Sequence, residues 1–207
     1  MPLGYSITAL VLAVLVLAYL ESFTQMVPLV VDSLLRDRGS NEIEGSIKKS
    51  RDRNFLCLTM VLALVLLSYR YSLVSPAFIA EYEPEIQFLM TAGLVLGYAL
   101  LHIVLYVLLK PRRGSEYYRR SNNTGYNFFI VAALLMSVTA AVMSLTPSSD
   151  LAVRRTLYIE MLVFYILMIV RRAQILRLNC RLLPTFLYLC ALEFLPLALL
   201  ICTVVLL

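Results

Sequence analysis

Four ionisable side chains stand within apolar stretches of this 207-residue chain: Arg70, His102, Glu160 and Glu193. Glu193 interrupts the segment FLYLCALEFLP (186–196), which is apolar on both sides of it. Counting 1.5 Å per helical residue from the basic end of each apolar run, Glu193 lies about 15 Å deep and His102 about 10 Å. Charges at such depth cost about 2.5–3.5 kcal/mol, so these residues should face protein or water, or Glu193 should stay protonated.

Two interpretations of these residues are open. In the first, His102, Glu193 and Glu160 form a column that passes protons or binds a cation. In the second, they are structural: Glu160 pairs with Arg70, while Glu193 hydrogen-bonds to a tyrosine, a backbone carbonyl or a partner chain. The structural interpretation is favoured, and it predicts that Glu193→Gln is tolerated, because glutamine keeps the hydrogen bonds.

We expect no catalytic, cofactor-binding or metal-binding residues. Enzyme chemistry needs a nucleophile beside a base, or paired carboxylates, and neither is recognisable. A single histidine excludes a bis-histidine haem and a His-rich metal cage, and no glycine-rich phosphate loop occurs. The four cysteines form no CxxC pair and read as buried apolar residues (Cys57, Cys180, Cys190 and Cys202). A membrane enzyme with an unrecognised motif is the third alternative.

The elements that position these residues are membrane-spanning helices. The chain is 61% hydrophobic and 15% charged, with mean hydropathy +0.84, which is too apolar for a soluble domain. The apolar runs are continuous and long enough to cross a bilayer, whereas barrel strands would alternate. The prediction is an all-α polytopic bundle that forms one integral membrane domain over 1–207, with no room for an attached soluble domain.

Six spans are predicted, at residues 3–20, 55–75, 86–109, 127–145, 151–170 and 182–205. In the fifth, only Thr156–Val170 separates two arginine pairs, which would have to snorkel to the interfaces. Asp150 is a suitable start for its helix. The first span could instead be a signal peptide, but it lacks a basic leading segment and an A-x-A-like cleavage site.

The 18 lysines and arginines set the orientation. They collect in the connections 21–54, 110–126 and 171–181, and outside these only Arg70, Arg154 and Arg155 remain. Basic connections stay cytoplasmic, so both termini are predicted to be periplasmic. This topogenic pattern also accounts for the basic charge, and we therefore expect no nucleic-acid partner.

The connection 21–54 is the longest. Its first part, MVPLVVDSLLRDR (26–38), could form a short amphipathic helix in the interface. Its second part, GSNEIEGSIKKSRDRN (39–54), is polar, and its basic residues either contact anionic lipid, at about 1 kcal/mol each, or act only in topogenesis, the favoured reading. Small residues that allow close helix packing occur in the third span (Gly93 and Gly97) and the fourth (Ala133, Ser137 and Ala141).

The segment FLYLCALEFLPLALL (186–200), preceded by YILMIVRRAQIL (165–176), resembles the ending of a family of uncharacterised multi-span inner-membrane proteins of Bacteroidetes. The resemblance implies signature positions at Tyr188, Cys190, Glu193 and Pro196, a bacterial inner membrane, and no established activity. Pro196 also leaves the carbonyl of Leu192 without its helical donor, so a polar group is needed there.

The combined prediction is a non-enzymatic subunit or assembly factor of a cell-envelope complex. Its partners would be the lipid bilayer and other membrane subunits, or further copies of itself. The alternative is a small proton- or cation-coupled transporter that uses Glu193, Glu160 and His102.

Overall fold

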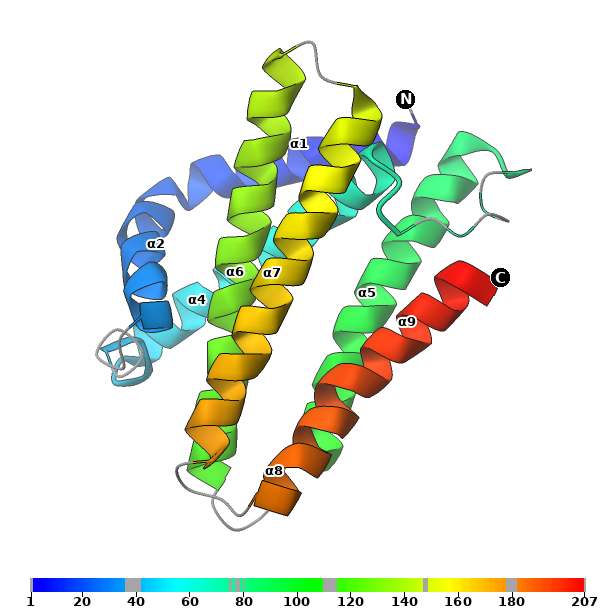
Figure 1. Cartoon of the computed structure of the whole chain (residues 1–207). Helices are drawn as coiled ribbons and strands as arrows, with labels where there is room; N and C mark the ends of the chain where they lie inside the picture. Colours follow the sequence, from blue (N-terminus) through cyan, green and yellow to red (C-terminus); the bar gives the residue numbers. More distant parts are fainter. Residues whose placement is uncertain are drawn as a thin grey trace.

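The computed structural model describes residues 2–35, 42–74, 76, 79, 81–109, 115–146, 149–177 and 182–206, and these ranges are helical with short connections (Figure 1). The elements are α1 (Leu3–Ala18), α2 (Leu20–Leu35), α4 (Ile47–Arg70), α5 (Pro84–Leu109), α6 (Ser115–Leu145), α7 (Asp150–Arg177), α8 (Leu182–Leu189), the π-helix η2 (Cys190–Phe194) and α9 (Leu195–Leu206). No strand occurs in the described ranges. The predicted all-α polytopic bundle is confirmed.

Helices α4 and α6 hold the bundle together, because most of the apolar clusters include a face of one or both. Val30 of α2, Leu56 of α4 and Ile130 of α6 are fully buried in one cluster. A second cluster joins α4 and α6 to α7 through Met136 and the fully buried Leu157. A third packs α1 and α5 against α4. Each of the outer helices α1, α2, α5 and α7 therefore packs on the α4–α6 pair.

Helices α6 and α7 form a long antiparallel hairpin (Figure 1). Its second helix begins at Asp150, as the sequence predicts, but the cap comes from the preceding residue: the amide of Ala152 donates to Ser149 Oγ at 3.3 Å. Asp150 lies in the first turn, where its negative charge interacts favourably with the positive end of the helix dipole. The predicted fifth span is thus a continuous helix.

The first two helices are one bent unit. The axes of α1 and α2 differ by 82°, and the break falls at Tyr19, whose ring lies 4.1 Å from that of Phe55. The segment in which an amphipathic helix was predicted is helical as far as Leu35, and 36–38 lie outside the described residues. Asn127 donates to Ser33 Oγ at 2.8 Å, which ties the buried face of α2 to α6.

In the described ranges, four helical segments qualify as membrane spans by length and composition: α4, α5, α6 and Phe186–Thr203. The bent pair α1–α2 makes a fifth if it is one span. The sequence predicted about six. The difference has two causes. At about 24 Å, the 16 residues of α1 are too short to cross alone, and α7 carries Glu160 between arginines at both ends. The orientation of the termini stays a prediction, and Cys180, Arg181 and Lys110 lie outside the described residues.

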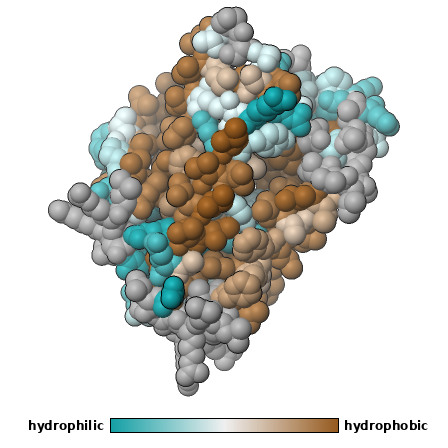
Figure 2. All heavy atoms as spheres, in the orientation of Figure 1, coloured by the Kyte–Doolittle hydropathy of each residue, from teal (hydrophilic) through white to brown (hydrophobic). Residues whose placement is uncertain are grey.

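Hydrophobic side chains cover the middle of the face shown in Figure 2, and hydrophilic ones gather toward its ends. This distribution is typical of a protein whose sides face hydrocarbon. Exposed large apolar residues are most numerous on α5 and α7. The protein is accordingly a multi-pass membrane protein, in which the few polar groups buried inside the bundle require an explanation.

Candidate functional site

The centre of the polar interior is an ion pair between Arg172 of α7 and Glu193 of η2. Arg172 is 0% exposed and Glu193 1%, and Arg172 Nη1 donates to Glu193 Oε1. His102 Nε2 of α5 lies 3.3 Å from the same oxygen. Arg172 Nε also donates to Ser121 Oγ of α6 at 3.3 Å. One carboxylate thus joins α5, α7 and η2, and its arginine reaches α6.

A π-turn aims Glu193 into the bundle. The amide of Leu195 donates to the carbonyl of Cys190, five residues earlier, instead of the four of an α-helix. Pro196 has no N–H to continue the regular pattern, and such breaks commonly accompany a proline. The hydroxyl of Tyr165 donates to the carbonyl of Glu193 at 3.2 Å. The sequence predicted a polar group at the carbonyl of Leu192. In the structure, the Tyr165 hydroxyl of α7 reaches the next carbonyl along the chain, that of Glu193.

Two small residues one turn apart on α6 make room for the arginine. Ser121 is fully buried, and Gly125 lies so close that a Cβ there would be 3.3 Å from Arg172 Nη1. The spacing of four residues places both on the side of α6 that faces α7. The sequence SNNTGYN (121–127) therefore provides a slot for the guanidinium.

Gly125→Val should lower the stability of the purified protein by about 1 kcal/mol, because the added methyl groups have to displace a guanidinium that is already fixed on both sides. The measurement is the thermal unfolding midpoint in detergent. Gly97→Val is the matched control, since a Cβ at Gly97 meets nothing within 4 Å. Equal midpoints for the two variants would contradict the slot.

An apolar wall surrounds the ion pair. Tyr188, Leu189 and Leu192 pack with Leu176 of α7 and Tyr118 of α6. The rings of Tyr118 and Tyr188 meet edge to face at 4.7 Å. In such surroundings the Arg172–Glu193 pair cannot exchange its contacts for water, so its chemistry is that of a fixed electrostatic tie. The buried Tyr188 hydroxyl lies beside the Arg172 guanidinium, within reach of a hydrogen bond to it.

The four residues singled out from the sequence do not form one site. The structure brings His102 and Glu193 together. Glu160 instead accepts a hydrogen bond from Thr139 of α6 at 2.7 Å. Arg70 is exposed, with its guanidinium 5.7 Å from the ring centre of Tyr71. The predicted ion pair of Glu160 with Arg70 is not formed: Glu160 is bound to Thr139, and Arg70 extends over the ring of Tyr71 into an exposed position.

The signature positions have separate surroundings. Tyr188 and Glu193 are buried beside Arg172, whereas Cys190 is half-buried at the start of the π-turn and Pro196 follows its end. The segment is therefore a structural unit: the proline and the π-turn orient the glutamate, and the tyrosine covers its arginine.

Sequence reasoning missed Arg172, because an arginine in a basic connection is fully explained by topology. The available signal was weak: one glycine, Gly125, in the polar stretch that begins α6. Within the described part of the chain, no three histidine, cysteine, aspartate or glutamate side chains lie close enough to hold a metal ion.

Comparison with known proteins adds a family and no activity. No curated protein and no solved structure matches the chain. A family model described as "Domain of unknown function (DUF4271)" matches residues 5–204. The match includes the signature positions and extends far beyond the C-terminal segments that carry the resemblance. The chain therefore belongs to this family of unknown function, as the sequence of its last spans implied.

Proposed function

We propose that this protein is a non-enzymatic subunit or scaffold of a cell-envelope complex in the bacterial inner membrane, and that α5 is the helix on which a transmembrane helix of another subunit packs. The observation that carries this proposal is the outer face of α5, which no other part of the described chain covers. A fixed interior with an open helix face suits a protein that holds others in place.

The face of α5 has the shape of a helix-packing surface. A Cβ built at Gly93 or Gly97 meets nothing within 4 Å. Leu89, Leu96 and Leu100 share this face by their spacing and are 71%, 46% and 63% exposed. In the most apolar 18 residues of α5, only 6% are buried by the rest of the described chain, whereas the corresponding share in α4 is 44%. Small residues flanked by leucines let another helix approach closely, which is the main source of helix association in lipid.

The interior favours this role over coupled transport. Glu193 contacts a fully buried arginine and a histidine, and a carboxylate fixed in this way is poorly suited to accept and release ions. Transport remains the second candidate because of a specific contact, the 3.3 Å between His102 Nε2 and Glu193 Oε1. Glu160 is remote from that contact and bound to Thr139, so the three-residue column of the transport hypothesis would have to be reduced to two.

Replacing Gly93 and Gly97 together with leucine should abolish co-purification of a stoichiometric partner, because leucine side chains would fill the groove between the flanking leucines. The open space around both positions predicts an unchanged thermal midpoint for the chain itself. The measurement is native purification in mild detergent with quantitative mass spectrometry. Ala13→Leu, an exposed position on α1, is the matched control and should retain the partner.

A wild-type protein that purifies folded and alone would overturn the subunit proposal. Loss of the partner in the Ala13 variant as well would place docking elsewhere. Proton flux in liposomes then tests the transport candidate with His102→Asn, which leaves the Arg172–Glu193 pair in place. Flux that disappears in this variant while the protein stays folded would favour transport.

A further inference from the structure

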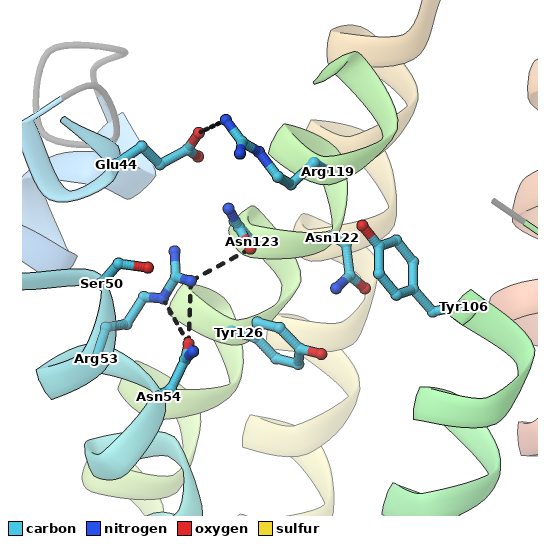
Figure 3. A pocket seen from close by; sticks show the side chains of 9 residues that line it. All are labelled: Glu44, Ser50, Arg53, Asn54, Tyr106, Arg119, Asn122, Asn123 and Tyr126. Atoms are coloured by element: carbon cyan, nitrogen blue, oxygen red, sulfur yellow. Dashed lines mark hydrogen bonds and ion pairs between the residues drawn. The ribbon is translucent and has the colours of Figure 1, made fainter. Parts of the chain in front are cut away.

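A polar cavity of about 280 Å³ lies at the end of the bundle where the basic connections emerge, between the first turns of α4 and α6 and the last turns of α5 (Figure 3). Arg53, Asn54, Arg119, Asn122, Asn123 and Tyr106 are among the residues that line it. It is separate from the face of α5 discussed above. Its chemistry can be deduced from how the lining groups use their donors and acceptors.

The Arg53 guanidinium donates hydrogen bonds to the side-chain oxygens of two asparagines. Its Nε and Nη2 donate to Asn54 Oδ1 at 3.3 and 3.0 Å, and Nη2 donates to Asn123 Oδ1 at 3.2 Å. Because both Oδ1 atoms face the guanidinium, the Nδ2 donors of Asn54 and Asn123 point away from it. Arg53 is only 3% exposed, so these two asparagines hold its guanidinium in a fixed position at the wall of the cavity.

The charge balance of the cavity is positive. Arg119 contributes a second guanidinium, whose Nη2 lies 4.0 Å from Glu44 Oε2, and its side chain is 57% exposed. Among the described residues that line the cavity, there are therefore two guanidinium groups and one carboxylate. A divalent cation would meet two guanidinium groups here, and two of the three asparagine oxygens already accept hydrogen bonds from Arg53. The remaining N–H donors of Arg53, Arg119 and the asparagines suit an oxyanion instead.

The depth of the cavity narrows the choice of oxyanion. Arg53 directly precedes the apolar part of α4, and Arg119 lies in the first turns of α6. The cavity is consequently at the level where the helices leave the hydrocarbon, which is where lipid phosphates lie. Tyr106 and Tyr126 supply hydroxyl groups there, and Asn122 Oδ1, buried without a partner among the described residues, can accept from a protonated phosphate or a headgroup hydroxyl.

We propose that this cavity binds a phosphate group through Arg53, Arg119 and the neighbouring asparagine amides, supplied either by a phospholipid headgroup or by free phosphate. The buried guanidinium of Arg53 is preorganised by Asn54 and Asn123, and the exposed Arg119 closes over the ligand. This inference is independent of the subunit role, since no residue of the docking face lines the cavity.

The test is calorimetric titration of the purified full-length protein in a neutral detergent. Inorganic phosphate, dihexanoyl phosphatidylglycerol and dihexanoylglycerol are titrated separately, and the last has no phosphate. Arg53→Gln and Arg119→Gln should each weaken binding about tenfold, as expected for a lost hydrogen bond to a charged group. Arg177→Gln, an exposed arginine at the same end of the bundle but outside the cavity, should leave affinity unchanged.

Binding of the phospholipid alone supports a headgroup site, binding of both phosphate compounds supports a site for the phosphate group itself, and binding of inorganic phosphate alone supports a soluble ligand. The proposal is overturned if neither inorganic phosphate nor dihexanoyl phosphatidylglycerol binds, or if dihexanoylglycerol binds as tightly as dihexanoyl phosphatidylglycerol. It is also overturned if Arg177→Gln weakens binding as much as Arg119→Gln. Should Arg53→Gln fail to fold, Arg119→Gln decides the matter, because its side chain is exposed and outside the core.

Discussion

Replacing Glu193 with glutamine should lower the free energy of unfolding by about 3–5 kcal/mol, the range expected when one partner of a buried ion pair is removed. Glutamine keeps a hydrogen-bonding oxygen but removes the charge that compensates Arg172. Because Arg172 is 0% exposed, water cannot solvate its charge in place of the carboxylate. The measurement is equilibrium unfolding in detergent, followed by circular dichroism. The expectation from sequence alone, that this substitution is tolerated, is reversed by the position of Arg172.

The control for Glu193→Gln is the double variant Arg172→Met with Glu193→Leu. Removing both charges leaves no uncompensated group, so this variant should recover most of the lost stability. A Glu193→Gln protein as stable as the wild type would contradict the buried pair. A double variant less stable than the single one would indicate that the tie contributes more than charge compensation.

Leu157→Ala should lower the free energy of unfolding by about 2 kcal/mol through the cavity it leaves. Leu157 of α7 is 0% exposed and packs with Val153 against Met136 and Ala140 of α6. Since lipid is as apolar as leucine, the loss arises from missing packing contacts and not from exposure to water. The same unfolding measurement applies.

Leu162→Ala is the control for Leu157→Ala, because Leu162 lies on the same helix but is 58% exposed. Its removal should change stability by less than about 0.5 kcal/mol. If the two variants are equally destabilised, or if neither is, then α7 does not pack on α6 along this stripe. The comparison therefore tests the packing of α7, the helix whose apolar run between arginine pairs is the shortest of the predicted spans.

Much of the fold follows from composition. Long continuous apolar runs predict the apolar parts of α4, α5 and α6, since in lipid only helices satisfy such a backbone. Only α5 agrees closely with its predicted span, because α4 and α6 begin eight and twelve residues earlier, at Ile47 and Ser115, in polar sequence that hydropathy does not assign to a span. The start of α7 at Asp150 follows equally from local chemistry. The bend at Tyr19 carries no comparable signal, because no proline or glycine marks it, and a continuous apolar run conceals it.

The candidate site was predictable only in part. Glu193 is conspicuous because its cost in lipid is large, and its contact with His102 follows from similar depth. Its main partner, Arg172, belongs to a pair of arginines that topology already explains, and periodicity does not say which of the two turns inward. The pairing of Glu160 with Thr139 is likewise a matter of helix rotation, since threonine raises no expectation in an apolar run.

The π-turn at Cys190–Phe194 has a consequence for the last helix. Each residue advances an α-helix by about 100°, so the extra residue held in this turn sets the angular phase of everything after it. Deleting one residue here would restore a regular helix and rotate α9 by about that angle. Leu195 and Leu199, now exposed on its outer side, would turn away from their present direction. Homologous chains that lack the turn would therefore need a shifted pattern of apolar residues to present the same surface to the bilayer.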